Sequence, residues 1–352
     1  MKSVCVLLLL VIAWLRLPAQ CIGYDSNPPQ LRHVTVTCLT TKDPVSAIVT
    51  FRYILRNDRR STGCIERFQL DIKRADDTQS LTDSGLVNVS RHVDRTALSD
   101  PHAAKVVPVG IPVLPTVKGA TNAWWAGFSI AGEVDWIRGF PKYLLEPGME
   151  LDSLILITYG LPGPRAFIVT PKYDPVPDTT KQETTEEEEH AFAQLLDLIR
   201  VKGITIGPTA PPISFVPITW IDTLLSYAQQ STDLGWLGKG RDDDCDDDER
   251  PESGIVKNIE LRLQKAKREL TKGDSVQGRK ELEKLVQKVE RIRKRSQEEE
   301  KKHKRDRWEK DSNVIMTGEA YALLKYNTEY LIDRLPEKSK NEKDDKDKKP
   351  KK

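Results

Sequence analysis

The sequence predicts an α+β protein of several domains, with an N-terminal antiparallel β-sandwich followed by a C-terminal helical bundle. Three observations support this prediction. Between about residues 31 and 175, apolar and polar residues alternate in short runs, which is the period of half-buried strands. From residue 219 onward, apolar residues recur at the spacing of amphipathic helices. No helical pattern separates the strand-like runs, which argues against a parallel α/β sheet.

The predicted sandwich covers residues 24–177. Seven or so short runs lie in this range, and the alternation is clearest in residues 47–55 and 68–72. Turn-forming residues such as Glu146-Pro147-Gly148 separate the runs. This many short strands over about 140 residues is typical of an antiparallel sandwich.

Residues 178–218 are expected to form a linker that contains one helix and a proline-rich connector. Thr185 followed by Glu188 is a capping-box pattern, and acidic residues in a first turn suit the helix dipole. Gly203 marks the expected end of this helix. Residues 208–217 are rich in proline and cannot be helical.

Four amphipathic segments then predict a helical bundle over residues 219–335, because such stripes cannot be buried singly. An acidic insertion at residues 238–252 separates the first helix from the second. Residues 336–352 are nearly all charged and are expected to form a disordered tail.

Particular residues of this segment suggest a known module. Gly235-Trp236 follows the first helix, Gly254-Ile255-Val256 opens the second, and Gly273-Asp274 makes a short turn before the third. With Leu285-Val286 in place of the usual Phe-Ile, the pattern resembles the FIMAH-type helical module of secreted bacterial proteins. The resemblance implies an accessory, non-catalytic module on exported or surface proteins, and it names no ligand. The acidic insertion departs from the compact pattern of that family.

The start of the chain predicts a secretory signal peptide at residues 1–19. A basic start precedes an apolar stretch at residues 4–15, which is short for a membrane span, and cleavage after Ala19 fits best. Alternatives are cleavage after Gly23, an uncleaved anchor, and a lipoprotein acylated at Cys21. We expect a secreted, periplasmic or cell-surface protein, without a transmembrane span once the signal is removed.

Export changes the interpretation of the five cysteines. A disulfide between Cys38 and Cys64 is expected in an oxidising compartment, and the alternative is two buried thiols. The bridge would close a loop of about 26 residues, which corresponds to roughly 3–4 kcal/mol. Cys21, if retained, could pair with Cys245 or stay unpaired, and spacing alone does not decide.

The candidate binding residues are Trp124, Trp125, Trp136 and Tyr143. Adjacent residues of a strand point to opposite faces, so one of Trp124 and Trp125 should be buried and the other exposed. An exposed tryptophan could stack on a sugar ring or anchor a partner protein. The alternative is that these aromatic residues belong to the core or to an inter-domain contact.

The candidate metal site is the acidic insertion, which could bind calcium; no other cofactor is expected. Calcium prefers several oxygen ligands, but contiguous aspartates lack the alternating spacing of an EF-hand loop. The alternative is a solvated loop of repelling charges. The candidate ligands are Asp242, Asp244, Asp246 and Asp248.

The sequence carries no strong catalytic motif, so we expect a non-catalytic exported or envelope protein that binds or scaffolds. The last 100 residues carry a net charge of +10 and the remainder −8. This asymmetry suggests an anionic glycan, another cell-surface polymer or an envelope protein as partner, while export argues against nucleic acid. The alternative is a secreted glycan hydrolase that uses Glu133 and Asp135, which share one face of a predicted strand. The oligomeric state is not predicted.

Overall fold

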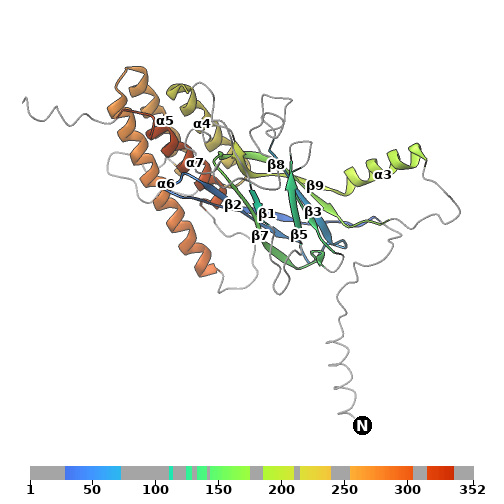
Figure 1. Cartoon of the computed structure of the whole chain (residues 1–352). Coiled ribbons are helices and arrows are strands. Elements are labelled where there is room, and N and C mark those ends of the chain that lie inside the picture. Colours follow the sequence, from blue (N-terminus) through green and yellow to red (C-terminus); the bar gives the residue numbers. More distant parts are fainter. Residues whose placement is uncertain are drawn as a thin grey trace, which may run out of the picture. The chain divides into compact units, whose positions relative to one another are not determined.

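The computed structural model is a mixed α+β protein, which confirms the predicted class (Figure 1). It describes residues 28–72, 111–113, 124–128, 133–140, 143–174, 185–209, 215–238, 254–303 and 315–336. The chain divides into two compact units. The strand unit comprises Met1–Gly160 and Pro164–Ala210, and the helical unit comprises Leu161–Gly163 and Pro211–Lys352.

The first sheet of the strand unit has the strand order β1-β2-β7-β4. Its strands are β1 (Thr35–Lys42), β2 (Val49–Arg56), β7 (Glu150–Thr158) and β4 (Ile111–Val113). All three pairings are antiparallel. Along β2 the buried residues alternate with more exposed ones, as the sequence predicts.

The second sheet has the strand order β5-β6-β3-β8-β9. Its strands are β5 (Trp124–Phe128), β6 (Glu133–Arg138), β3 (Ile65–Asp71), β8 (Leu161–Pro171) and β9 (Val201–Thr209). The central strand β3 pairs antiparallel with β6 and β8, both of which come much later in the chain. The strand β5 forms one edge of this sheet.

Aromatic rings from both sheets meet in the core of the strand unit. The ring of Tyr53, on β2, lies 5.6 Å from that of Phe68 and 5.6 Å from that of Trp136, which belong to the second sheet. Phe68 and Trp136 are opposite each other in the register and stack at 5.4 Å. Such pairs contribute about 0.5–1.5 kcal/mol each beyond their burial.

The expected linker contributes a strand to the second sheet. Helix α3 (Glu186–Ile199) begins with the predicted capping box between Thr185 and Glu188. It is followed at once by β9, so the strand unit extends to residue 210 rather than 177. Gly203 lies inside β9 and does not end the helix: a Cβ atom there would stand 2.5 Å from the ring of Phe167. The missing side chain therefore allows β9 to approach that ring.

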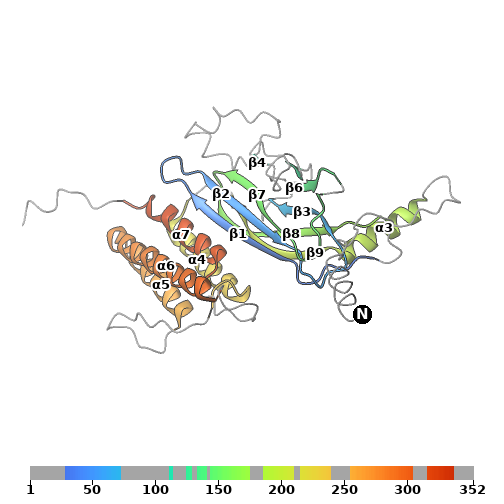
Figure 2. The same ribbon diagram turned by 90° about the horizontal axis from the view of Figure 1, so that it is seen from below.

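The four expected helices of the C-terminal half are all present (Figure 2). They are α4 (Pro217–Asp233), α5 (Ile255–Thr271), α6 (Ser275–His303) and α7 (Gly318–Ile332). The expectation that residue 217 is not helical is wrong, because proline is accepted at the first position of a helix. Their apolar stripes meet in one cluster, of which Leu224, Leu263, Leu285 and Leu324 are buried members. The indole Nε1 of Trp220, on α4, donates to the carbonyl of Asn327, on α7, over 3.0 Å. Among the described residues, no helix is both long and apolar enough to cross a membrane.

The predicted disulfide between Cys38 and Cys64 is wrong. The Sγ atom of Cys38 lies 3.7 Å from Oγ1 of Thr40 in the core. Cys38 lies within β1 of the first sheet, opposite Tyr53, whereas Cys64 immediately precedes β3 of the second sheet. Cys64 is buried. No disulfide joins two residues of the described ranges.

Several expectations fall on parts of the chain that lie outside the described residues. These are the signal peptide at residues 1–19, the calcium candidates between Asp242 and Asp248, and residues 337–352 of the expected tail.

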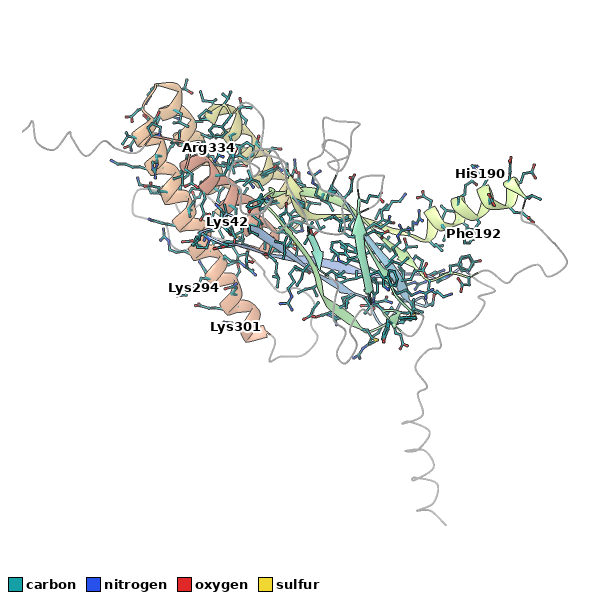
Figure 3. All side chains as sticks on the ribbon, viewed as in Figure 1. Lys42, His190, Phe192, Lys294, Lys301 and Arg334 are labelled. Carbon is teal, nitrogen blue, oxygen red and sulfur yellow. The ribbon has the colours of Figure 1, made fainter. Side chains whose placement is uncertain are left out.

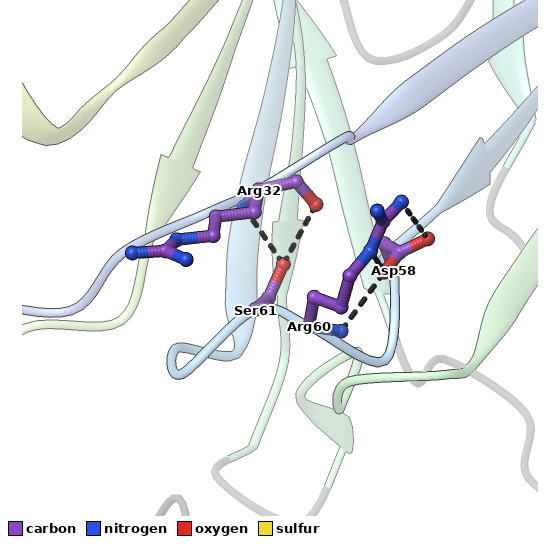
Figure 4. Close-up of polar contacts among 4 residues, drawn as sticks. All are labelled: Arg32, Asp58, Arg60 and Ser61. Atoms are coloured by element: carbon purple, nitrogen blue, oxygen red, sulfur yellow. Dashed lines mark hydrogen bonds and ion pairs between the residues drawn. The ribbon is translucent and has the colours of Figure 1, made fainter.

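The loop between β2 and β3 is held by local polar contacts (Figure 4). Arg60 donates from its backbone N–H to Oδ1 of Asp58 over 2.9 Å, and its Nε donates to the same oxygen over 2.8 Å. Ser61 Oγ accepts from the backbone N–H of Arg32 over 2.9 Å and donates to the carbonyl of Arg32 over 3.1 Å. These contacts join the loop to the segment that precedes β1.

The side-chain hydrogen bond from Arg60, followed by its backbone N–H, lowers the pKa of Asp58 from 3.8 to about 2. We predict that Arg60→Ala raises this pKa but leaves it below 3.8, because the backbone N–H still donates. The folded-state pKa is depressed, so the contribution to stability is present above about pH 4 and is lost as pH falls toward 2. Carboxyl NMR titration would measure the shift. Arg32→Ala is the control, because that side chain contacts Gln30 instead; an unchanged Asp58 pKa in Arg60→Ala would contradict the assignment.

Candidate functional site

The two adjacent tryptophans of β5 point to opposite faces of the second sheet, as strand geometry requires. Trp124 is 1% exposed, and its Nε1 donates to the carbonyl of Tyr143 over 2.9 Å. Trp125 is 60% exposed. The structure therefore assigns Trp124 to the core and leaves Trp125 as the tryptophan of this pair that a ligand can reach.

The other two candidate residues do not join Trp125. Trp136 is fully buried in the aromatic core, so it stabilises the fold. The ring of Tyr143 makes an edge contact with that of Phe140, 6.2 Å away. The four-residue group predicted from sequence therefore separates into core residues, a neighbouring aromatic pair and one exposed tryptophan.

Strand register places further side chains beside Trp125. We use the term outer face for the side of the second sheet that carries Trp125, Gly127, Ile137, Asp135, Glu133, Arg67 and Gln69. Trp125 is opposite Ile137 on β6, and Ile137 is in turn opposite Arg67 on β3. The neighbouring row contains Gly127, Asp135 and Gln69. Ile137, like Trp125, is exposed.

Gly127 leaves open space on this face. A Cβ atom built at this position would meet nothing within 4 Å. Gly127 lies two residues from Trp125 along β5, so both are on the same side of the strand. A flat ring stacked on Trp125 could therefore extend over Gly127 without meeting a side chain there.

The charged groups of the outer face are held in place by one another. The guanidinium of Arg67 donates from Nε to Oδ1 of Asp135 over 2.8 Å, and its Nη2 donates to Oδ2. Gln69 Nε2 donates to Oε2 of Glu133 over 2.8 Å. The hydrogen bond to Asp135 raises the pKa of Arg67, which therefore stays charged. These contacts fix polar groups close to an exposed ring.

The carboxylates of the alternative hydrolase do share this face. Glu133 and Asp135 are two residues apart on β6, which corresponds to roughly 6–7 Å along a strand. Both oxygens of Asp135 accept hydrogen bonds from Arg67. In this arrangement Asp135 is a partner of the guanidinium of Arg67.

Metal binding finds little support in the described ranges. No group of three or more His, Cys, Asp or Glu side chains there is arranged to hold an ion. The calcium expectation therefore still rests only on the acidic insertion.

The positive charge of the C-terminal half is partly neutralised by ion pairs within the helical unit. Lys294 and Lys301 are exposed along α6 (Figure 3). Burial lowers the pKa of Lys325, but its hydrogen bonds to Glu290 and Tyr321 raise it by more. Examples of these ion pairs are Lys284–Glu281 at 2.8 Å, Arg279–Glu283 at 3.0 Å and Lys325–Glu290 at 2.5 Å. Cations and anions thus mix on these helices, as on an ordinary solvated surface.

Sequence reasoning missed Arg67, Gln69 and Ile137 as members of this face. The alternation Arg67, Gln69, Asp71 against Phe68 and Leu70 is visible in the sequence and gives their side of the strand. Which strand lies beside β3 is not visible locally, because Arg67 and Asp135 are 68 residues apart.

Comparison of the chain with protein-family models, with curated proteins and with solved structures finds no match.

Proposed function

We propose that this chain is an exported, non-catalytic binding protein whose outer face binds an uncharged glycan. The observation that carries the proposal is the exposure of Trp125 beside Ile137 and the open position at Gly127. An exposed indole offers a flat apolar surface on which the C–H face of a sugar ring can stack. The polar groups fixed beside it can exchange hydrogen bonds with sugar hydroxyls.

The charge of the outer face favours a neutral ligand over the anionic glycan expected from sequence. Beside Trp125 and Ile137, the cation Arg67 is paired with Asp135. Glu133 adds a further negative charge beside Gln69. A polyanion would meet net repulsion here, so the basic character of the C-terminal half does not describe this surface.

Binding is favoured over hydrolysis because the carboxylates of Glu133 and Asp135 accept hydrogen bonds from neighbouring side chains of the same sheet. A glycosidase needs one carboxyl that carries a proton and another that is free to act as base or nucleophile. Here Arg67 occupies both oxygens of Asp135. This pairing supports the proposed non-catalytic role.

In the proposed architecture the two sheets form a β-sandwich and α4–α7 form an accessory helical bundle of the FIMAH type. Contacts of Tyr53 with Phe68 and Trp136 support the sandwich, because they join the two sheets through one core. In support of the FIMAH resemblance, α4 and α5 are each followed by a glycine with positive φ, Gly235 at 71° and Gly273 at 81°. Gly254 stands at the N-cap of α5, where that pattern has its opening glycine.

Replacing Trp125 tests the proposed function. We predict that the secreted chain is retained by at least one insoluble neutral polysaccharide among cellulose, chitin and starch, and less by anionic pectate. Trp125→Ala should weaken that retention at least tenfold, which corresponds to about 1.4 kcal/mol of lost stacking. Pull-down isotherms on the washed polymers would measure both quantities.

Phe140→Ala is the matched control, because Phe140 is 55% exposed but does not belong to the outer face. Circular dichroism should show that both variants are folded. Equal retention of Trp125→Ala and the unaltered chain, or equal losses in the two variants, would contradict the proposal.

A further inference from the structure

Helix α3 buries none of its 14 residues, whereas α4, α5 and α7 each bury several. Figures 1 and 2 both show α3 extending away from the two sheets of its own unit. We propose that α3 is a surface for self-association, and that it pairs antiparallel with α3 of a second copy of this chain. The proposal does not depend on glycan binding.

One face of α3 carries a continuous row of apolar side chains, which we call the α3 stripe. Leu198, beside this row, is 81% exposed. Figure 3 shows His190 on the opposite side of the helix from Phe192, so polar residues occupy the other face. The members of the stripe recur at helical spacing and are all partly exposed: Phe192, Leu195, Leu196 and Ile199.

The contacts of α3 within its own unit leave the stripe partly exposed. The ring of Phe192 stacks on that of Tyr173, with the ring centroids 6.0 Å apart and an interplanar angle of 24°. Even with this contact, no residue of the helix is buried. An isolated helix of this length is only marginally stable in water, and most helices gain their stability by packing an apolar face. We therefore expect a further apolar surface against the stripe.

The charges at the two ends of α3 favour a second copy as that surface. The first turn consists of four consecutive glutamates, at residues 186–189. Two cations, Arg200 and Lys202, follow the helix directly. In an antiparallel pair, each glutamate turn lies beside the two cations of the other copy, and the helix dipoles also attract each other. A parallel pair would instead bring the two glutamate turns together.

The cation Lys202 is accessible to a second copy, although it already has a partner. Its Nζ lies 2.6 Å from Oδ1 of Asp197, and both side chains are more than half exposed. Such an exposed pair contributes little by itself, so the ammonium can also approach a glutamate of the second copy.

The stripe is self-complementary about a two-fold axis. When the axis passes between Leu195 and Leu196, Phe192 of each copy lies opposite Ile199 of the other. A two-fold interface uses the same surface twice, so one stripe supplies both sides. A helix of this length extends over about 21 Å, which makes the interface smaller than the standard size. We therefore expect a weak dimer, with a dissociation constant on the order of 10 μM.

Sedimentation velocity of the full chain, from about 1 to 100 μM, tests the proposal. The average mass should rise with concentration from that of the monomer toward that of the dimer. Leu196→Glu should raise the dissociation constant at least about tenfold, because it places a charge in the stripe. Gln194→Glu is the matched control: it adds the same side chain to the polar face of α3 and should leave the dissociation constant within about twofold.

Carbodiimide cross-linking tests the antiparallel direction, because this reagent joins a lysine to a carboxylate that it contacts. Ordinary and heavy-nitrogen-labelled chains are mixed, cross-linked and digested. Lys202 should be joined to a glutamate of residues 186–189 from the differently labelled chain. Within one chain the whole length of α3 separates these groups, so a cross-link between them reports the second copy.

Several results would overturn the proposal. These are a monomer over the whole concentration range, equal association of Leu196→Glu and the unaltered chain, or a dimer without the cross-link from Lys202. A monomer whose α3 amides are protected from hydrogen exchange would show that another segment of the same chain covers the stripe. Circular dichroism should show that both variants are folded, because glutamate is a good helix former. If Leu196→Glu fails to fold, cross-linking of the unaltered chain still decides.

Discussion

Trp136→Ala should destabilise the strand unit by about 3–5 kcal/mol, the range for deleting a large buried aromatic side chain. Trp136 is fully buried, and its ring contacts those of Phe68 at 5.4 Å and Tyr53 at 5.6 Å. Truncation removes the ring that both contact and leaves a cavity between the two sheets. The midpoint of the strand-unit transition in urea, followed by circular dichroism, measures the loss.

Two further variants separate this effect from a general effect of losing tryptophan. Trp136→Phe should cost much less than Trp136→Ala, because a ring remains and the described residues offer no hydrogen-bond acceptor to the indole Nε1. Trp125→Ala should change stability by less than about 0.5 kcal/mol, because that ring is largely exposed. Similar midpoints for Trp136→Ala and Trp125→Ala would show that the aromatic core is assigned wrongly.

Asn57→Ala should cost about 3 kcal/mol, although it removes only a small polar side chain. Asn57 is fully buried, and its Nδ2 donates to the carbonyl of Gly63 over 2.9 Å and to that of Leu145 over 3.0 Å. Both carbonyls would lose a donor in a region that water does not reach. Urea denaturation measures the expected loss.

Asn57→Asp is the matched variant, because it keeps the volume but cannot donate when ionised. It should be at least as unstable as Asn57→Ala at neutral pH. Burial beside two carbonyls should raise the pKa of the introduced carboxyl in the folded state. Stability should therefore return as pH falls through that value and the protonated acid donates one bond. A loss under 1 kcal/mol for both variants would show that the two hydrogen bonds contribute little.

Much of the fold follows from local patterns in the sequence. The alternation of β2, the capping box at Thr185 and the four apolar helix stripes are each visible within one short stretch. Each depends on a period or on a contact between residues a few positions apart. The opposite orientations of Trp124 and Trp125 follow from the same strand geometry.

The parts that sequence reasoning missed depend on distant residues. The strand β9 has the sequence VKGITIGPT, in which the glycines and the proline are typical of a connector. Its place in the sheet depends on the close approach of Gly203 to the ring of Phe167, which belongs to a distant part of the sequence. Cys38 and Cys64 are close in sequence, yet Cys38 lies within β1 of the first sheet and Cys64 precedes β3 of the second. The partners that hold Asp135 and Glu133 come from β3, more than 60 residues earlier.

The strand order of the second sheet has a kinetic consequence. The first strand of that sheet to be synthesised, β3, pairs with β6 and β8, and its end near Ile65 pairs with Pro171. These contacts span about 100 residues, and a topology of such high contact order folds slowly. A nascent chain in which β8 has not yet been synthesised therefore lacks the pairing between β3 and β8. The second sheet can therefore be completed only after β8 has been synthesised.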